Sequence, residues 1–157
     1  SSRIVESVIE VNEAQKARMI QKIRRCLDND VSGKLIAVLG LTFKPGTDDM
    51  RDSPACSIQP NLLESGARIR AHDPHGMDEA RKVLPKEIEY MENLYDIFKG
   101  ADAVVLLTEW NEYRGLDMAD VKADMRSNKF IDLRNVYEPA RMRELGFDYC
   151  CVGRPVS

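Results

Sequence analysis

The sequence predicts an α/β fold: a Rossmann-like, doubly wound parallel sheet in three layers, with a helix at the N-terminus. Short apolar runs of strand length recur along the chain, for example at residues 34–40 and 102–108. Segments with helical spacing or helix-start signals separate these runs. Strands that alternate with helices pair in parallel through right-handed crossovers, so helices are expected on both faces of one sheet.

Residues 4–27 are predicted to form the first helix, because apolar residues recur there at helical spacing and give the helix one apolar face. These positions are Ile4, Val8, Val11, Ile20, Ile23 and Leu27. Gly33, in the following "DNDVSGK", is expected to stop the helix. We assign residues 1–30 to a helix that leads out of a preceding region and residues 31–157 to the α/β domain. Because the sequence starts without Met and inside a helical pattern, we expect a piece of a longer protein.

The α/β domain is expected to begin with a strand at residues 34–40, whose continuous apolar run is typical of burial on both faces. A helix follows over residues 53–67, with Ser53 as N-cap, Pro54 in the first turn and Gly66 as the stop. Further strands are predicted at residues 67–74, 102–108, 129–135 and 147–153, with a short strand or loop at residues 88–91. Further helices are predicted at residues 76–84, 93–101, 117–125 and 138–146.

Composition excludes several classes of protein. Hydrophobic residues make up 43% and charged residues 31% of the 157 residues, which is typical of a globular domain. The net charge of −3 and the lack of a dense basic stripe argue against nucleic acid or an anionic membrane surface as partner. No apolar run is long enough to span a bilayer. With no C-x-x-C pair and no signal peptide in "SSRIVESVIE", we expect a cytoplasmic protein with reduced thiols in or near the core; they are Cys26, Cys56, Cys150 and Cys151.

The loop "GLTFKPGTDDMRDSP", residues 40–54, follows the first buried strand, where doubly wound sheets bind ligands. Lys44 is a cation at the end of the strand, and the planar fork of Arg51 suits phosphate or carboxylate. Three aspartates can pin these cations or cap the next helix: Asp48, Asp49 and Asp52. The loop therefore either binds a charged ligand or is a surface loop whose charges satisfy one another, and spacing alone leaves both readings open.

Known phosphate-binding motifs do not describe this loop. A dinucleotide fingerprint needs G-x-G-x-x-G, but Gly40 is followed by Leu41 and Thr42, and the next glycine is Gly46. Asp73 could mimic the acid that binds an NAD ribose, but it lies 33 residues after Gly40 (73 − 40) rather than ~20. A P-loop is excluded because Gly-Lys-Ser/Thr is missing.

Two other groups of residues are candidate sites. His72, Asp73 and His75 could suggest a metal site, but two histidines and one carboxylate on a short loop rarely suffice, so no metal is predicted. Glu109 and Trp110 sit at another strand end and could line the ligand crevice, although Trp110 could equally belong to the core.

Several segments, in this order and spacing, resemble the C-terminal domain of the nucleotide-sugar dehydrogenases, the UDP-glucose/GDP-mannose dehydrogenase family. They are "IAVLGLTFKPGTDDMRDSPA", "HDP", "ADAVVLLTEWNEYR", "FIDLRNVYEP" and the closing "VGRP". The resemblance covers essentially the whole chain. The first segment together with "DLRN" is specific to the family.

The resemblance implies roles for four residues. Phe43 and Lys44 match the pair that contacts the UDP-sugar, and Arg134 of "DLRN" matches an arginine with the same role. Arg51 matches the arginine that reaches NAD held by the facing domain. These assignments suit the chemistry, because a diphosphate and a dinucleotide both attract cations in a crevice.

The resemblance also implies what these residues lack. Full-length members oxidise the 6-hydroxyl of the sugar to a carboxylate with two NAD, through a nucleophilic cysteine in a "GGSCFPKD"-like segment. Neither Cys26 nor Cys56 has such surroundings, and the N-terminal G-x-G-x-x-G is missing, so NAD is expected to bind mainly to another domain. We therefore predict no catalytic residue here and no dehydrogenase activity for this chain alone.

The sequence leaves three properties open: the sugar nucleotide, the kind of protein and the oligomeric state. "TEW" and "DLRN" favour UDP-glucose as the substrate, but GDP-mannose and UDP-N-acetylmannosamine are handled by sibling families. A stand-alone nucleotide-binding module is the alternative to a dehydrogenase domain. The full-length enzyme is expected to be a homo-oligomer whose contacts lie largely outside this chain.

Overall fold

The computed structural model describes the backbone of residues 2–152 and the side chains of residues 13–152. Its helices are α1 (Ser2–Cys26), α2 (Ala55–Glu64), α3 (Met77–Val83), the 3₁₀ helix η1 (Leu94–Phe98), α4 (Asn111–Arg114), α5 (Met118–Asp124) and α6 (Pro139–Glu144). Its strands are β1 (Leu35–Leu39), β2 (Arg68–His72), β3 (Glu89–Tyr90), β4 (Ala103–Leu106), β5 (Lys129–Asp132) and β6 (Asp148–Cys151).

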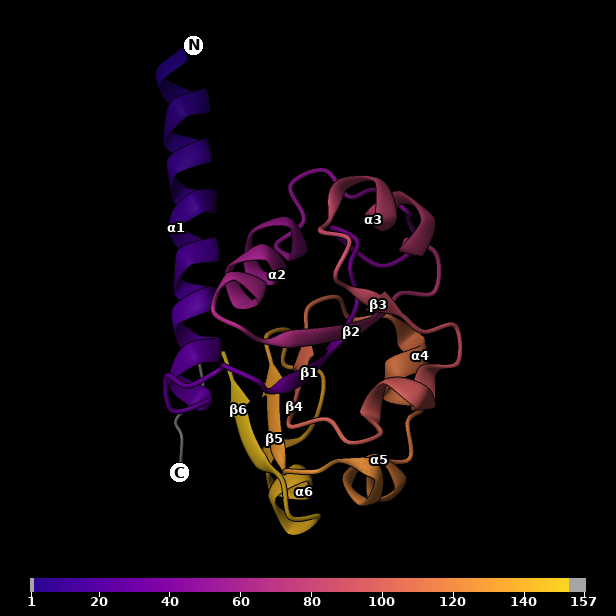
Figure 1. Cartoon of the computed structure of the whole chain (residues 1–157). Helices are drawn as coiled ribbons and strands as arrows, with labels where there is room; N and C mark the ends of the chain where they lie inside the picture. Colours follow the sequence, from indigo (N-terminus) through magenta and orange to yellow (C-terminus); the bar gives the residue numbers. More distant parts are fainter. Residues whose placement is uncertain (1, 153–157) are drawn as a thin grey trace.

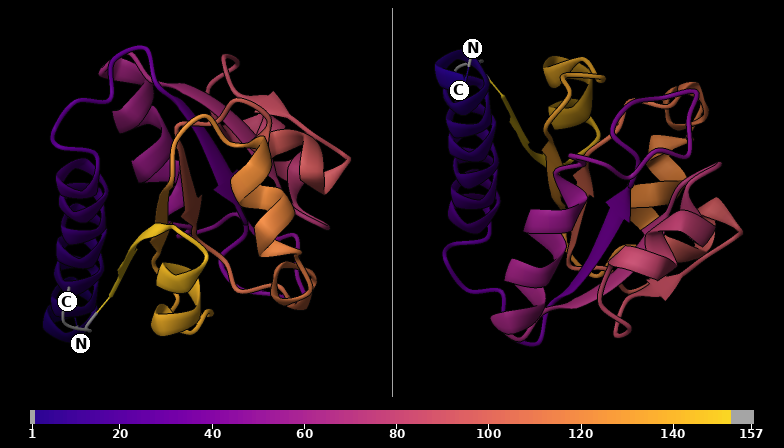
Figure 2. Two further views of the ribbon diagram at one scale, coloured as in Figure 1. Left: turned by 90° about the horizontal axis from the view of Figure 1, so that it is seen from below. Right: turned by 90° about the horizontal axis from the view of Figure 1, so that it is seen from above.

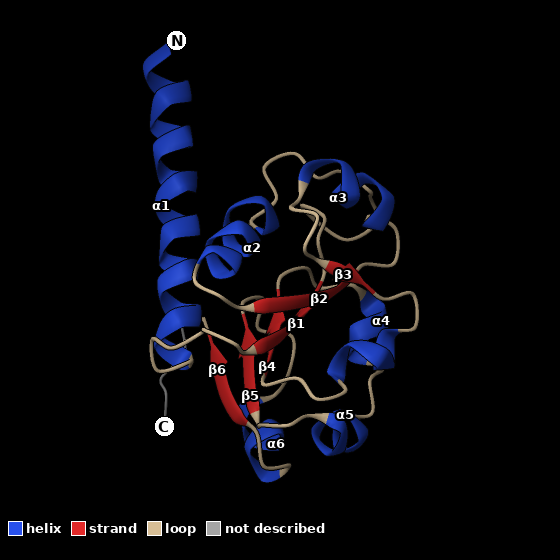
Figure 3. Ribbon diagram, viewed as in Figure 1, coloured by secondary structure: helices blue, strands red, loops and turns tan. Residues whose placement is uncertain are grey.

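The strands form one six-stranded sheet in the order β3-β2-β1-β4-β5-β6 (Figures 1 and 3). Every pair of neighbouring strands is parallel, and β1 pairs with both β2 and β4. This is the strand order of a doubly wound Rossmann sheet, whose topological switch point lies between β1 and β4. The structure therefore confirms the predicted fold class.

The core lies on both faces of the sheet, as expected for three layers. Alternate residues of β1 point to opposite faces, so Ile36 and Val38 belong to one apolar cluster while Ala37 and Leu39 belong to the other. The first cluster joins the sheet to α1, α2 and α3, and the second joins it to η1, α4, α5 and α6. Figure 2 shows the sheet enclosed between helices.

Helix α1 is attached to the domain through its second half, and its first turns project past α2 (Figure 1). Ile23 and Leu27 are buried in the first cluster. The guanidinium of Arg24 donates to the side chain of Asn61 at 2.7 and 3.1 Å and to the hydroxyl of Ser65 at 2.5 Å. The predicted apolar positions Ile4, Val8 and Val11 lie outside the residues whose side chains are described. Among the described residues, no helix is both long and apolar enough to cross a membrane.

Several helices differ from the predictions in where they end, in their type or in having been missed. The prediction that Gly33 stops α1 is wrong: the helix ends at Cys26 because Asp28 and Asn29 turn to φ values of 58° and 57°. Residues 94–98 form a 3₁₀ helix, since bonds such as that from the Asp96 N–H to the Asn93 carbonyl span only three residues. The four-residue helix α4 was not predicted, because four residues are too few to show a helical period.

The N-cap of α2 also differs from the prediction. The cap position belongs to Pro54, not Ser53. The Ser53 hydroxyl accepts a bond from the Ala55 N–H at 3.2 Å and donates to the Leu41 carbonyl at 2.5 Å. Ser53 therefore joins the start of α2 to the segment that follows β1.

Gln59 of α2 is an unusual residue for a core position. Its side chain is fully buried, and neither amide atom has a hydrogen-bond partner among the described residues. A buried unpaired polar group costs about 1–3 kcal/mol. We therefore expect Gln59→Leu to raise the free energy of unfolding by about 1–2 kcal/mol in urea denaturation. The exposed Gln21→Leu is the control and should change it by less than about 0.5 kcal/mol. An unchanged or lowered value for Gln59→Leu would contradict the argument.

Candidate functional site: the carboxyl edge of the sheet

The switch point is built around Gly40, the residue after β1. Gly40 has φ +91°, and a Cβ placed there would lie 2.5 Å from the Cβ of Thr108. Only glycine fits this conformation and this close approach without strain. The Thr108 hydroxyl donates to the Thr42 carbonyl at 2.7 Å. The segments after β1 and β4 are therefore held together where the strand order reverses.

Asp73, directly after β2, anchors the loops at this edge. Its side chain is buried, and six donor atoms lie 2.7–3.2 Å from its carboxylate oxygens. The donors are the backbone N–H groups of Leu41, Thr42, His75 and Gly76, the hydroxyl of Thr42 and the indole N–H of Trp110. The carboxylate thus joins the segments that follow β1, β2 and β4. Its oxygens are occupied by the protein itself, which agrees with rejecting Asp73 as a ribose ligand.

The histidines beside Asp73 contact aromatic rings. The Nδ1 of buried His72 lies 3.1 Å from the hydroxyl of Tyr113, and burial lowers the pKa of His72. The ring of His75 stacks on Trp110, with ring centroids 4.9 Å apart. In the part of the chain that the structure describes, no group of three or more His, Cys, Asp or Glu side chains could hold a metal ion. Trp110 itself is buried, so of the two readings left open for it, packing is the one that the structure supports.

Phe43 and Lys44 lie on the surface of the loop after β1. The Phe43 side chain is 50% exposed, which is unusual for a large apolar residue, and its backbone N–H donates to the Asp49 carbonyl at 2.9 Å. Lys44 is exposed and forms no salt bridge within the described residues. An exposed aromatic ring beside an unpaired cation is suited to contact a base or sugar and a phosphate together.

Arg51 lies further along the same loop and points into solvent. Its side chain is 90% exposed, and its guanidinium donates to both carboxylate oxygens of Asp49 at 3.0 Å. The hydrogen bonds from Arg51 lower the pKa of Asp49. Of the three aspartates that the sequence places near Arg51, Asp49 is therefore the one that pairs with it.

Arg134 follows β5 and is positioned by a second buried carboxylate. Asp132 is fully buried and accepts hydrogen bonds from the backbone N–H of Arg134 at 2.9 Å and from the hydroxyl of Tyr149 at 2.6 Å. The guanidinium of Arg134 pairs with Glu109, with Nη2 3.1 Å from Oε1. Partial burial raises the pKa of Glu109, but the hydrogen bonds and charge of Arg134 outweigh it, so the net shift is downward.

The sheet brings Lys44 and Arg134 to the same edge, with β4 between their strands. Arg134 lines an open pocket of about 490 Å³ together with α1, and the pocket contains three cations and no acid. Its residues are Gln15, Arg18, Met19, Lys22, Leu133, Arg134 and Val152. Arg51 lines a different pocket, beside α3. Lys44 and Arg134 thus share the carboxyl edge, although Lys44 is not among the residues that line the Arg134 pocket. That both cations contact one UDP-sugar stays a prediction.

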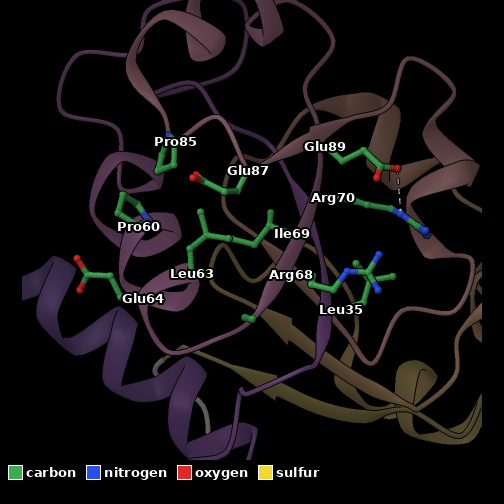
Figure 4. A pocket seen from close by; sticks show the side chains of 11 residues that line it. Leu35, Pro60, Leu63, Glu64, Arg68, Ile69, Arg70, Pro85, Glu87 and Glu89 are labelled. Atoms are coloured by element: carbon green, nitrogen blue, oxygen red, sulfur yellow. Dashed lines mark ion pairs between the residues drawn. The ribbon is translucent and has the colours of Figure 1, made fainter.

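A larger pocket, about 560 Å³, lies at the opposite edge, around the starts of β1 and β2 (Figure 4). Its charges are mixed, and Arg70 pairs with Glu89 at 3.4 Å in its wall. Ligands of doubly wound sheets bind at the carboxyl ends of the strands, near the switch point. We therefore place the site by topology and not by pocket size.

The four cysteines have different environments. Cys150 and Cys151 are buried, Cys26 is partly exposed, and Cys56 is exposed, so the expectation of thiols in or near the core is wrong for Cys56. The predicted "VGRP" segment continues beyond residue 152, outside the described residues.

Comparison with known proteins agrees with the resemblance seen in the sequence. The family model described as "UDP-glucose/GDP-mannose dehydrogenase family, UDP binding domain" matches residues 37–139. A UDP-glucose 6-dehydrogenase of Rhizobium meliloti is 43% identical over 98% of this chain and 35% of its own length. UDP-glucose 6-dehydrogenase TuaD of Bacillus subtilis is 36% identical over 98% of this chain and 33% of its own length. The chain thus spans about a third of the curated relatives it matches.

Solved structures give the same answer for the fold. The UDP-glucose dehydrogenase of Pyrobaculum islandicum superposes with a TM-score of 0.72 at 32% identity, covering 94% of this chain and 32% of its own. An NDP-N-acetyl-D-galactosaminuronic acid dehydrogenase of Methanosarcina mazei superposes with a TM-score of 0.80 at 30% identity, covering 94% of this chain and 31% of its own. Enzymes named for different sugars thus share this domain.

Proposed function

The chain belongs to the UDP-glucose/GDP-mannose dehydrogenase family, and we propose that it is the domain that holds the nucleotide end of a UDP-sugar in an NAD-dependent dehydrogenase. We propose UDP-glucose as the sugar nucleotide, since several relatives are named UDP-glucose 6-dehydrogenase. The full-length homo-oligomer would convert UDP-glucose, two NAD and water into UDP-glucuronate and two NADH. The nucleophilic cysteine and most of the NAD site would come from residues outside this chain.

The observation that carries this proposal is the pair of cations at the carboxyl edge. Lys44 has no salt-bridge partner among the described residues, and Arg134 presents a planar guanidinium held by a single carboxylate. A diphosphate attracts such groups through charge-assisted hydrogen bonds. The exposed ring of Phe43 adds an apolar surface beside Lys44. In this proposal the chain's own residues bind and orient the substrate, while NAD supplies the hydride acceptor.

Calorimetric titration of the 157-residue chain with UDP tests this function. We expect UDP to bind, and Lys44→Ala to weaken binding about 10- to 100-fold, because a hydrogen bond to a charged group contributes about 1.5–3 kcal/mol. Lys99→Ala is the control, since Lys99 is also exposed and pairs with Asp96 away from the site. No UDP binding, or equal losses in both variants, would refute the proposal. Titration with UDP-N-acetylmannosamine and GDP-mannose compares the alternative sugar nucleotides.

Substitution of Arg51 in the full-length enzyme tests whether this residue contacts the cofactor and not the substrate. Because its guanidinium is exposed to solvent and Arg51 lines a different pocket from Arg134, we expect Arg51→Ala to raise the KM for NAD about 10-fold and to leave the KM for UDP-glucose nearly unchanged. The matched control is Arg81→Ala, another exposed arginine paired with a nearby aspartate. A loss confined to UDP-glucose would show that Arg51 serves the other ligand.

A further inference from the structure

The open pocket between α1 and the ends of β5 and β6 takes two of its three cations from α1. These two are Arg18 and Lys22, and the third is Arg134. The pocket has no acid among its lining residues. Leu133 and Arg134 directly follow β5, and Val152 directly follows β6. The pocket therefore lies at the carboxyl edge of the sheet, where doubly wound folds bind ligands.

The direction of α1 brings its two cations to this edge. Asp28, just after α1, lies 3.8 Å from the ammonium of Lys129 at the start of β5, so the helix ends near the amino edge. Lys22 and Arg18 precede Asp28 by 6 and 10 residues (28 − 22 and 28 − 18). A helix rises about 1.5 Å per residue, which places them about 9 and 15 Å further toward the carboxyl edge. Figure 1 shows α1 and β6 running in opposite directions.

The two cations of α1 lie close together without a counter-charge. Arg18 and Lys22 are four residues apart, so their side chains are neighbours on one face of the helix, and like charges at this spacing destabilise a helix. Neither forms a salt bridge with a described residue. In the described part of α1 the acid is Glu13, whose carboxylate pairs with Lys16 at 3.4 Å. An anion in the pocket would remove this repulsion.

Arg134 is already oriented for a ligand. Its Nε and Nη2 atoms donate to the carboxylate of Glu109, while Nη1 forms no hydrogen bond with a described residue. Glu109 itself does not line the pocket. A guanidinium held by a carboxylate through two of its nitrogens keeps N–H groups available for a second acceptor.

The rest of the pocket is partly apolar. Met19 packs against the first apolar cluster, Leu133 is buried in that cluster, and Val152 is 37% exposed. Apolar side chains beside the cations reduce contact with water, and charge interactions are stronger where water is reduced. The volume of about 490 Å³ lies in the range of small-molecule sites.

The charges of the pocket favour phosphate over carboxylate. A single carboxylate brings one negative charge to three cations, whereas linked phosphate groups bring several. The planar forks of two arginines also match the oxygens of phosphate groups. The small volume and the net charge of −3 fit a low-molecular-mass phosphate compound rather than a nucleic acid.

We propose that this pocket is a phosphate-binding site, in which Arg18 and Lys22 of α1 act together with Arg134. The three side chains would donate charge-assisted hydrogen bonds to the oxygens of one phosphate-bearing ligand. Two sources have this chemistry: the diphosphate of a sugar nucleotide and a free phosphate compound. The proposed function rests on Lys44 and Arg134, so the new assignment is that of the two α1 residues, and it holds for either source.

Calorimetric titration of the 157-residue chain with inorganic pyrophosphate at low salt tests the proposal. We expect pyrophosphate to bind, and Arg18→Gln and Lys22→Gln each to weaken binding about 10-fold, as expected for loss of a charge-assisted hydrogen bond. Arg25→Gln is the matched control, because Arg25 is an exposed cation of the same helix that does not line the pocket. It should change the affinity by less than about 3-fold, since exposed charges at a distance are screened.

Thermal unfolding gives a second measurement. Pyrophosphate should raise the melting temperature of the unsubstituted chain, because a ligand that binds only the folded state stabilises it. The same addition should leave the double variant Arg18→Gln/Lys22→Gln unchanged. Absence of pyrophosphate binding to the unsubstituted chain would overturn the proposal whichever variants fold. Equal losses in Arg25→Gln and in the two pocket variants would also overturn it.

Titration of the same variants with UDP separates the two sources. Losses that match those for pyrophosphate would assign the pocket to the diphosphate of the sugar nucleotide, and an unchanged affinity for UDP would assign it to a free phosphate compound. The proposed function fails if UDP does not bind or if Lys44→Ala has no specific effect. Neither of those results decides whether Arg18 and Lys22 bind pyrophosphate, so the two proposals can fail separately.

Discussion

Asp73→Asn is expected to lower the free energy of unfolding by about 3–5 kcal/mol, because hydrogen bonds to a buried charged group contribute about 1.5–3 kcal/mol each. One carboxylate oxygen accepts from the N–H groups of His75 and Gly76, and the other faces Leu41, Thr42 and Trp110. Whichever way the asparagine amide turns, its NH₂ group faces at least two N–H donors. Urea denaturation of the 157-residue chain measures the loss.

The control for this experiment is Asp78→Asn, which removes a charge without removing an anchor. Asp78 is 91% exposed, and within the described part of the chain its salt bridge is to Arg81, at a surface position of α3. Its substitution should change the free energy of unfolding by less than about 0.5 kcal/mol. An Asp73→Asn variant within about 1 kcal/mol of the unsubstituted chain would show that the carboxylate is not the anchor described here.

Arg134→Ala in the full-length enzyme is expected to raise the KM for UDP-glucose about 10- to 100-fold with a smaller change in the KM for NAD. The substitution would remove a charge-assisted contact of about 1.5–3 kcal/mol to the sugar nucleotide. The backbone of Arg134 is held by Asp132, so the loop should keep its shape when the side chain is removed. Steady-state kinetics with each substrate varied in turn measures the effect.

Two variants make the Arg134 result interpretable. Arg126→Ala removes an exposed arginine near Asp102, at the amino edge of the sheet, and should leave both KM values unchanged. Glu109→Gln removes the carboxylate that competes for Arg134, so it should not raise the KM for UDP-glucose. If Arg126→Ala and Arg134→Ala behaved alike, or if neither changed KM, the assignment of Arg134 to the substrate would be wrong.

The strands could be predicted from the sequence because burial on both faces leaves a clear apolar run. Leu35–Leu39 and Ala103–Leu106 are such runs, and each lies within its predicted range. Asp28 and Asn29, which end α1, were harder to foresee, because left-handed backbone at a non-glycine residue has no strong sequence signal.

The candidate site could be predicted where its residues are close in sequence or directly follow a buried strand. It could not be predicted where its contacts depend on which strands are neighbours in the sheet. Lys44, Arg51 and Arg134 follow buried strands, so their placement at one edge could be anticipated. The bonds from Asp73 to His75 and Gly76 form a local turn that "HDPHG" could have indicated. Its bonds to Leu41 and Trp110 span 32 and 37 residues, and they exist only because β1 lies between β2 and β4.

The hydrogen bonds of Asp73 have a consequence for protein engineering. They make residues 40–54, 73–76 and 107–110 a single recombination block, since a chimera with a crossover between residues 77 and 102 would take the loop after β4 from one parent and its anchoring carboxylate from another. Crossovers before residue 35 or after residue 125 leave the block intact. Libraries that aim to change the sugar nucleotide should therefore exchange these three loops together and vary Arg134 separately.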